Sequence, residues 1–505
     1  MSCYYRYSAL LLVLVAVSFL AAGCTMQANN SSQESAADAA RAQADRAFAD
    51  ADYHAASGLY ALAQENYTAT GDTADALLAR NRGFESVRMT LEFPYNRSAI
   101  EAEMVRAFPN ASAAQRAAWL DANMTATLKS DGEVWYFYDT VSNVRYHNPS
   151  LIQADYARAN HTPLYDEMVP LIAAPWKNGT GPYGEPVTYT GVTELDIPRG
   201  ELPANGTLKI WMPVPITSGT QTNVTILSVE PARYVKSSTG TGADIGLVYL
   251  GIPLEEITDP FLNVTARFSF VQHEQRVAID PAKVLPYNTT SPEYLKYTAS
   301  GKNIVITPAM KAKAQEIVGN ETNPYLQAQK IYWHIVDTHP YSHAPHLLLS
   351  TSGTPESAYV LDTGIGDCGS QSMYFAALCR SLGIPARAIG GYQMIRGSAS
   401  THFWAEYYLE GYGWVPVDVT VAEGGTWSYN ATPADLHRYQ GYFFGSLDPY
   451  RYIIQNDVDI PLTPDPGNAV LFKMVVQTPI SVCDTCPDDV DLTLKQYATT
   501  TVKQA

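Results

Sequence analysis

The hydrophobic pattern changes along the chain, from helical at the start to strand-like in the middle and mixed afterwards. Residues 36–88 are rich in Ala, and Tyr53, Tyr60 and Tyr67 recur at a spacing of seven, which places them on one face of a helix. Asp72 can cap a second helix. The pattern therefore predicts a helix, a turn and a second helix.

This segment, residues 36–90, resembles a tetratricopeptide-type unit, of which only about one and a half copies are present. Because roughly three copies are needed for stability, we expect the unit to pack on its neighbour. Residues 91–175 form a mixed helical region, in which the aromatic run 135–138 is interpreted as core.

The rest of the chain contains strand-like stretches and then helical ones. Residues 180–285 contain short alternating stretches separated by turn residues, which indicates a β-sandwich domain. Residues 290–460 return to helical patterns, followed by a strand hairpin. Residues 461–505 are a C-terminal extension that is partly strand-like.

The N-terminus indicates export. Its apolar run, residues 9–22, is 14 residues long, whereas a membrane-spanning helix needs about 20. Residues 1–24 therefore fit a signal peptide, and the small residues before Cys24 resemble a lipoprotein processing site, followed by a flexible tether at 25–35. Ordinary cleavage nearby and an uncleaved anchor are the alternatives. We expect an extracytoplasmic protein held at the membrane by a lipid or signal anchor.

Charge and cysteine content exclude several classes of protein. The chain of 505 residues has 33 Lys and Arg against 50 Asp and Glu, a formal charge of -17, so nucleic acid is an unsuitable partner. No metal-binding His pair, calcium-loop pattern or Gly-rich phosphate loop is present, so neither a metal nor a cofactor is expected. Cys379 is interpreted as core. Cys483 and Cys486 are interpreted as a disulfide-closed loop, with a zinc half-site or a redox pair as alternatives.

Asparagine is concentrated in glycosylation signals. Of 21 Asn residues, 14 stand in Asn-X-Ser/Thr, where chance would give roughly three. We interpret this as an N-glycosylated surface in an archaeal or similar cell envelope; the alternative is that Asn-rich loops happen to be rich in Thr. The positions are 29, 30, 66, 96, 110, 123, 160, 178, 205, 223, 263, 288, 320 and 430.

One cysteine stands where a reactive thiol is expected. Cys368 follows a glycine-flanked turn and precedes an apolar run of helical period that ends at Gly383. The unpaired N–H groups and the dipole of a helix start favour thiolate over thiol. A buried cysteine in the core is the structural alternative.

A predicted hairpin supplies the partners of that thiol. His402 lies on an alternating strand, residues 401–409, and Asp418 lies at the end of a second strand, residues 414–419. Side chains alternate between the two faces along a strand, and directly opposed residues of a hairpin share a face. His402 and Asp418 therefore lie on the same face only if the numbers of each opposed pair of residues add up to an even value. A loop that pairs Leu409 with Gly413 meets this condition and makes His402 and Asp418 diagonal neighbours.

Several motifs together resemble the transglutaminase-like core, a superfamily of microbial cysteine proteases, transglutaminases and peptide N-glycanases with a papain-like α+β fold. They are the stretches 366–368, 378–387, 390–392, 402–406 and 413–418. The resemblance covers about residues 290–460 and implies that Cys368 is the nucleophile, His402 the general base and acid, and Asp418 the residue that orients it. No motif places the second oxyanion donor, for which Trp333 and Tyr359 are candidates.

The resemblance implies a thiol enzyme that acts on amide bonds of a protein or peptide substrate of the cell envelope. An acyl-enzyme formed on Cys368 is resolved by water in a peptidase or amidase, and by an amine in a crosslinking transglutaminase. Hydrolysis is favoured because no Lys-rich docking segment for an acceptor is evident. A catalytically idle adhesion or scaffold module of the envelope is the alternative function.

Overall fold

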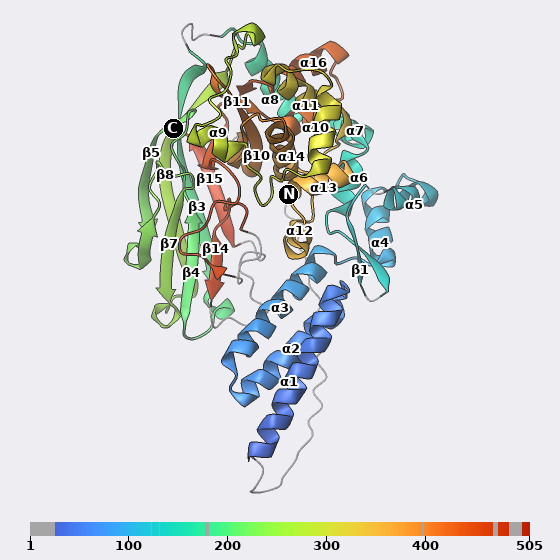
Figure 1. The fold of residues 1–505 in the computed structure, drawn as a ribbon, viewed down its shortest axis with the longest axis vertical. Helices are drawn as coiled ribbons and strands as arrows, with labels where there is room; N and C mark the ends of the chain where they lie inside the picture. Colours follow the sequence, from blue (N-terminus) through green and yellow to red (C-terminus); the bar gives the residue numbers. More distant parts are fainter. Residues whose placement is uncertain are drawn as a thin grey trace.

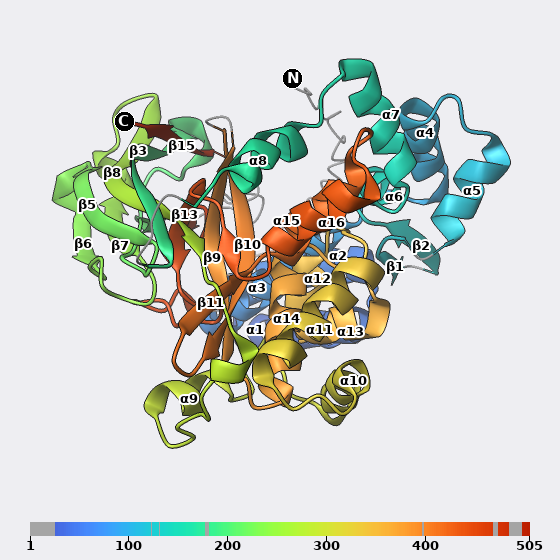
Figure 2. The ribbon, with the colours of Figure 1, turned by 90° about the horizontal axis from the view of Figure 1, so that it is seen from above.

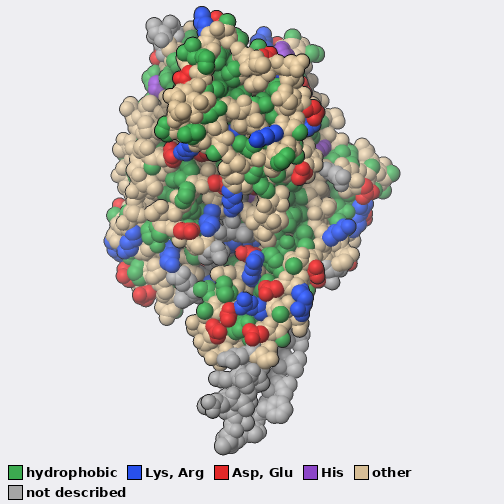
Figure 3. Space-filling view, viewed as in Figure 1, with side chains coloured by type: hydrophobic (Ala, Val, Ile, Leu, Met, Phe, Trp, Pro, Cys, Tyr) green, Lys and Arg blue, Asp and Glu red, His purple; other side chains and the backbone are tan. Residues whose placement is uncertain are grey.

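The computed structural model describes residues 26–122, 124–130, 132–176, 181–395, 398–467, 473–483 and 497–505. Three long N-terminal helices project from one end, two β-sheets occupy one side of the body, and a helical domain built on a third sheet occupies the other (Figures 1 and 2). Acidic and basic side chains are mixed over the face seen in Figure 3 rather than separated by sign. No helix of the described ranges has the length and hydropathy of a membrane span.

The N-terminal helices are α1 (Met26–Ala49), α2 (Tyr53–Thr70) and α3 (Thr73–Glu92). Asp72 caps α3 by accepting the Asp75 N–H at 3.1 Å, as the sequence predicts. Tyr53, Tyr60 and Tyr67 are buried, which confirms the predicted stripe. The segment expected to be a tether, from residue 26 onward, is the start of α1, so its polar composition did not prevent helix formation. The signal segment 1–24 lies outside the described residues.

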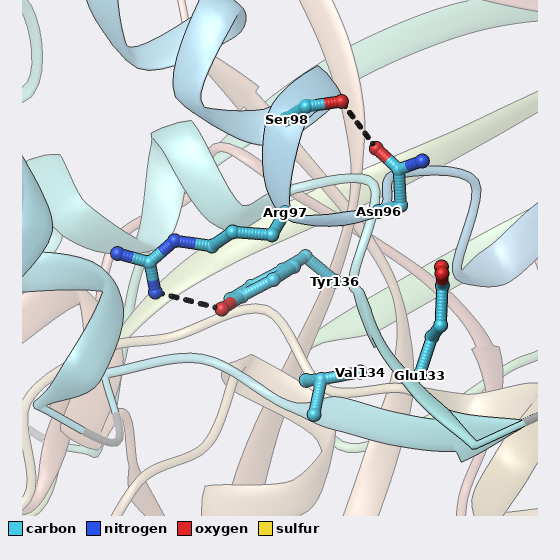
Figure 4. Close-up of a pocket in the computed structure, with 6 residues that line it drawn as sticks. All are labelled: Asn96, Arg97, Ser98, Glu133, Val134 and Tyr136. Atoms are coloured by element: carbon cyan, nitrogen blue, oxygen red, sulfur yellow. Dashed lines mark hydrogen bonds between the residues drawn. The ribbon is translucent and has the colours of Figure 1, made fainter.

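The mixed region that follows contains five helices and a hairpin among its described residues. A cluster that includes Ile100, Met104, Trp119 and Val144 holds it together. An open hollow of about 500 Å³ lies between its first helix and the hairpin, where Arg97 donates to the Tyr136 hydroxyl at 3.1 Å (Figure 4). The elements are α4 (Arg97–Ala107), α5 (Ala113–Asp121), β1 (Thr127–Ser130), β2 (Glu133–Tyr136), α6 (Thr140–Tyr146), α7 (Pro149–Ala159) and α8 (Pro163–Ala173).

Two mainly antiparallel sheets follow, and side chains from both share one buried cluster. One sheet has the order β12-β8-β3-β15 with β5 also on β8, and the other has the order β14-β4-β7-β6. The C-terminal extension supplies β14 to one sheet and β15 to the other, so these two described strands belong to the strand-rich region. The strands are β3 (Tyr183–Pro198), β4 (Thr207–Pro213), β5 (Gln221–Glu230), β6 (Val235–Ser238), β7 (Leu247–Pro253), β8 (Phe261–Arg276), β12 (Ser446–Leu447), β14 (Ile480–Cys483) and β15 (Ala498–Gln504).

The remaining domain packs helices on a sheet of order β11-β10-β9-β13. Its central helix, α14, is buried along nearly its whole length and contacts the sheet, which places the first residue of α14, Cys368, beside β10. The helices are α9 (Pro292–Tyr297), α10 (Pro308–Val318), α11 (Pro324–Thr338), α12 (His346–Ser352), α13 (Glu356–Thr363), α14 (Cys368–Ser381), α15 (Val419–Gly424) and α16 (Pro433–Tyr442), with a short 3-10 turn η5 (Gly425–Trp427). The strands are β9 (Ala386–Ile395), β10 (Ser398–Leu409), β11 (Gly413–Val417) and β13 (Arg451–Gln455).

Candidate active site

A tightly packed turn fixes the start of α14. The Asp367 carboxylate accepts the Ser370 N–H at 3.0 Å, and the Ser370 hydroxyl accepts the Asp367 N–H at 2.9 Å, which makes a reciprocal cap. A Cβ at position 366 would lie 2.5 Å from Ser370 Oγ and 2.8 Å from Val360 Cγ2. Only glycine fits there, so the turn and the cap together set where Cys368 begins the helix.

The Cys368 thiol is partly exposed, whereas Cys379 is buried. The backbone N–H groups of Phe403 and Gly369 lie close enough to the Cys368 sulfur to lower the pKa of the thiol, so the thiol abuts β10 one residue beyond His402. Burial raises the pKa of the Cys368 thiol, and the negative charge of Asp367 raises it further. Burial thus opposes the thiolate that the helix start favours, and ionisation of Cys368 needs a proton acceptor.

The hairpin has the predicted register. Leu409 pairs with Gly413 and Ala405 with Val417, an even sum in each case. Gly411 and Gly413 have φ values of 89° and 84°, which residues other than glycine rarely adopt. His402 and Asp418 therefore turn to the same side, and the His402 Nε2 to Asp418 Oδ2 distance is 2.8 Å.

Asp418 is fully buried, and two further hydrogen bonds hold its carboxylate. Its Oδ1 accepts the Val421 N–H at 3.0 Å, which caps α15, and its Oδ2 accepts Arg451 Nη1 at 2.5 Å. Burial alone would raise the pKa of Asp418, but His402 and Arg451 hold it well below its usual range. An ionised Asp418 accepts the His402 Nε2–H, which leaves His402 Nδ1 without a hydrogen bond among the described residues.

Arg451 is the residue at this site that sequence reasoning missed. It is fully buried, donates to Asp448 Oδ2 from Nη2 at 2.7 Å, and places its guanidinium 5.1 Å from the centre of the Trp404 ring. Arginine within the apolar stretch 450–454 was the available signal, since a buried charge requires a partner. The predicted pair His402 and Asp418 is thus part of a buried ionic network.

A second imidazole, also missed, is joined to the cap of α14, the helix that begins with Cys368. His346 Nε2 lies 2.7 Å from Asp367 Oδ2, and His346 Nδ1 lies 2.8 Å from Glu356 Oε1. Burial opposes a charge here, but Glu356 and Asp367 raise the pKa of His346 well above its usual value. Both ring nitrogens are occupied by carboxylates, so His346 is an imidazolium that fixes Asp367 in place.

Aromatic rings gather next to Cys368. Tyr146 of α6 lies 4.8 Å from Tyr341 and stacks at 5.1 Å on Trp427, measured between ring centres. Tyr341 pairs through its backbone with Gly366, and His343 contacts both tyrosine rings. Burial and then the proximity of Cys368 raise the pKa of Tyr341. Tyr146, Tyr341, His343 and Trp427, the aromatic cluster, thus bring a side chain of the mixed helical region to the thiol.

Other predicted residues have different surroundings. Trp333 stacks on His437 at 4.7 Å between ring centres, and none of the described contacts of Trp333 or Tyr359 involves Cys368. Cys483 is buried, while Cys486 lies outside the described residues, so the disulfide stays a prediction. Within the described ranges, no three His, Cys, Asp or Glu side chains are placed to hold a metal ion.

Residues 311–419, which include Cys368, His402 and Asp418, match the family model of the transglutaminase-like superfamily. A Haemophilus influenzae protein of unassigned function is 32% identical over 162 residues, which cover 27% of this chain. The match covers 42% of that relative, less than half of its length.

Solved structures of two other proteins are similar to this chain. A candidate cysteine protease from Cytophaga hutchinsonii is 14% identical, with a TM-score of 0.38, over 64% of this chain and 99% of the other. The periplasmic domain of TgpA from Pseudomonas aeruginosa is 13% identical, with a TM-score of 0.24, over 53% of this chain and 96% of the other. From the family match and the motifs it contains, residues 311–419 of this chain are a transglutaminase-like domain.

Proposed function

We propose that this chain is a thiol enzyme that acts on amide bonds, with Cys368 as nucleophile, His402 as general base and acid, and Asp418 as the residue that orients the imidazole. The observation that carries the proposal is the 2.8 Å bond from His402 Nε2 to Asp418. That bond leaves Nδ1 as the nitrogen available to a thiol, and the sulfur of Cys368 lies against the N–H of the next residue, Phe403.

The reaction begins with transfer of the Cys368 proton to His402 Nδ1. The sulfur then attacks the carbonyl carbon, and the Cys368 N–H, at the start of α14, stabilises the developing oxyanion. When the intermediate collapses, the C–N bond breaks, His402 returns the proton to the leaving amine, and a thioester remains on Cys368. Asp418 keeps the imidazole in one tautomer and stabilises its charge, and Arg451 keeps Asp418 ionised.

The fate of the thioester separates a hydrolase from an acyltransferase. We propose hydrolysis, in which His402 removes a proton from water and the acid is released. A supplied amine distinguishes the two: mass spectrometry of the products with and without a primary amine shows whether the acyl group passes to water or to nitrogen. A product that is mainly the new amide identifies an acyltransferase and corrects this part of the proposal.

The substrate and the compartment are also proposals. The acidic charge and the lipoprotein-like N-terminus support an exported protein, anchored through Cys24 or an uncleaved signal, that acts on peptides or proteins of an archaeal or similar cell envelope. Among the sequon asparagines whose exposure is described none is buried, and eight are exposed. These are Asn110, Asn160, Asn205, Asn223, Asn263, Asn288, Asn320 and Asn430. Mass spectrometry of native protein tests both features; an unprocessed N-terminus with unmodified asparagines contradicts them.

The regions outside the enzyme domain are proposed as flanking modules. We interpret α1 to α3 as a tetratricopeptide-like unit and the two facing sheets as a β-sandwich, because each has a hydrophobic cluster of its own. The alternative of an idle adhesion or scaffold module is less favoured, because such a module has no need of a buried, charge-balanced His402 and Asp418 pair beside a partly exposed thiol.

Labelling with a thiol-reactive amide probe tests the function directly. Wild-type Cys368 should react faster than free cysteine at neutral pH, and the variant His402→Ala should remove that excess. Peptide mapping assigns the label, with buried Cys379 as the internal control. A Cys368 that reacts no faster than free cysteine supports the idle module instead.

A further inference from the structure

A buried carboxylic acid and a buried amide lie against each other behind the turn that precedes Cys368. Gln371, in the first turn of α14, is fully buried, and Glu423, near the end of α15, is 4% exposed. Gln371 Nε2 donates to Glu423 Oε2 at 3.2 Å and to the Gly366 carbonyl at 3.0 Å. The same Gly366 oxygen accepts the Ser342 N–H at 2.9 Å. Glu423 is therefore connected through one side chain to the turn that precedes Cys368.

Each member of this pair has one oxygen without a hydrogen bond. Among the described residues, neither Glu423 Oε1 nor Gln371 Oε1 has a partner, although both are buried. An amide oxygen and an ionised carboxylate oxygen are both acceptors, so neither can satisfy the other. A single proton on Glu423 Oε1 converts it into a donor. One hydrogen bond between the two oxygens then satisfies both buried atoms, each of which costs free energy when it has no partner.

We propose that Glu423 is held in its protonated form and that its O–H donates to Gln371 Oε1, which closes a ring of two hydrogen bonds between the acid and the amide. The ring fixes the Gln371 side chain, whose N–H group holds the Gly366 carbonyl. Glu423 is thus a positioning residue for the turn that precedes Cys368. This positioning role rests on the proposed function, whereas the protonation of Glu423 does not.

The surroundings of Glu423 contain no described cation that could favour its ionised form by direct contact. On its own element the charged neighbour is Asp418, and α11 contributes Tyr332. His339, whose carbonyl also accepts from Gln371, has a pKa lowered to about 4 by burial and is neutral. On α16 the Tyr439 hydroxyl donates to a backbone carbonyl of α15, and Tyr341 is the remaining titratable neighbour. Burial and the charge of Asp418 raise the pKa of Glu423 well above its usual value, and the Gln371 hydrogen bond opposes them.

The variant Glu423→Gln tests the proton through stability. The amide is neutral at every pH and can form the same ring, so it replaces the protonated acid. In wild type, the folded state keeps the proton of Glu423 and the unfolded state loses it above the ordinary pKa of 4.5. The folded state then binds more protons, so wild-type stability falls as pH rises. The ratio of wild-type to variant folding constants should fall about tenfold per pH unit between about pH 6 and pH 8.

A ratio that is independent of pH overturns the proposal, because it means that Glu423 is ionised in the folded state. The matched control is Glu101→Gln on α4, where the side chain is 52% exposed and no buried proton is expected. Its ratio to wild type should stay flat over the same range of pH.

Infrared difference spectra of the full chain give a second readout that needs neither unfolding nor activity. Subtracting Glu423→Gln from wild type at neutral pH should show one carbonyl band of a protonated carboxylic acid. A difference that contains carboxylate bands instead contradicts the proposal.

The positioning role has its own test in the reactivity of Cys368. Glu423→Gln should keep the labelling rate, whereas Glu423→Leu, which cannot form the ring, should lower it about tenfold. Equal rates in both variants refute positioning. If Cys368 is unreactive in wild type, the proposed function fails, while the stability and infrared results still decide the protonation of Glu423.

Discussion

The imidazoles of His402 and His346 have opposite hydrogen-bond environments. His402 contacts one carboxylate, Asp418, whose charge is also balanced by Arg451. His346 contacts two carboxylates, Asp367 and Glu356, one at each ring nitrogen. His402 therefore retains one nitrogen for proton exchange, whereas His346 retains none.

This difference separates a histidine that is suited to proton transfer from one that is suited to structural support. A general base must release and accept a proton, so it cannot be held at both nitrogens. An imidazolium between two carboxylates is suited to holding a structure in place, because removing it leaves two buried carboxylates without their shared cation. The two roles are distinguished by the number of ring nitrogens that carboxylates occupy. Proximity to the nucleophile alone does not distinguish them.

The largest expected effect tests the thiol that His402 is proposed to serve. Cys368→Ala should lower amide cleavage or acyl transfer by about 10⁴-fold or more and leave the fold intact. Cys379→Ala should keep activity and lower the free energy of unfolding by about 1 kcal/mol through a small cavity. Steady-state kinetics and denaturant unfolding of both variants measure this. Equal losses of activity and stability in the two variants contradict the assignment of Cys368.

Replacing each imidazole should then separate activity from stability. His402→Ala should lower activity by about 10³-fold with a modest change in stability, because Asp418 keeps Arg451 and the Val421 N–H. His346→Ala leaves Asp367 and Glu356 buried without their shared cation, and should lower the free energy of unfolding by about 3–5 kcal/mol. Chemical denaturation and labelling of Cys368 give the two readouts. The reverse pattern would exchange the roles of the two histidines.

The pH dependence of stability sharpens the comparison. Because the pKa of His346 is raised in the folded state, its contribution to the free energy of unfolding is complete below about pH 6.5. That contribution is lost as pH rises through the pKa of His346 in the folded state. The slope reaches about 1.4 kcal/mol per pH unit, and His346→Gln should remove it. Asp418, whose pKa is lowered, contributes stability above about pH 3.9 that is lost as pH falls. Unfolding curves of wild type and variant across pH measure this; an unchanged alkaline slope in His346→Gln argues against a charged His346.

The smallest effect concerns the aromatic cluster. It contains a third imidazole, His343, which contacts Asp139 at 2.7 Å. If this cluster binds substrate, Tyr146→Ala should raise KM about tenfold and leave kcat nearly unchanged. The control is Phe261→Ala on β8, an aromatic residue that is 57% exposed. A fall in kcat without a change in KM would mean that the cluster supports the turn rather than the substrate.

The features that local patterns predicted were the helix start at Cys368 and the hairpin register. Both depend on residues close in sequence: the cap within three residues, and a loop between Leu409 and Gly413 with glycines at positive φ. The family match covers the three predicted site residues, and their catalytic roles stay a proposal.

What the sequence did not predict depends on contacts between distant segments. Arg451 is 33 residues from Asp418, and Asn143 of α6 contacts His343 200 residues away. No periodicity indicates which buried arginine meets which aspartate. The same holds for β15, near the C-terminus, which pairs with the much earlier strand β3, because strand pairing is set by the assembled sheet rather than by either strand.

The position of β13 affects how this protein can be divided for study. Residues 451–455 pair with β9 on the side opposite β10 and deliver Arg451 to Asp418. A fragment limited to the family match at 311–419 would leave β9 as an open edge and Asp418 without its arginine. Such a fragment should aggregate or unfold, so a truncated domain has to extend at least through residue 455 before its inactivity says anything about the thiol.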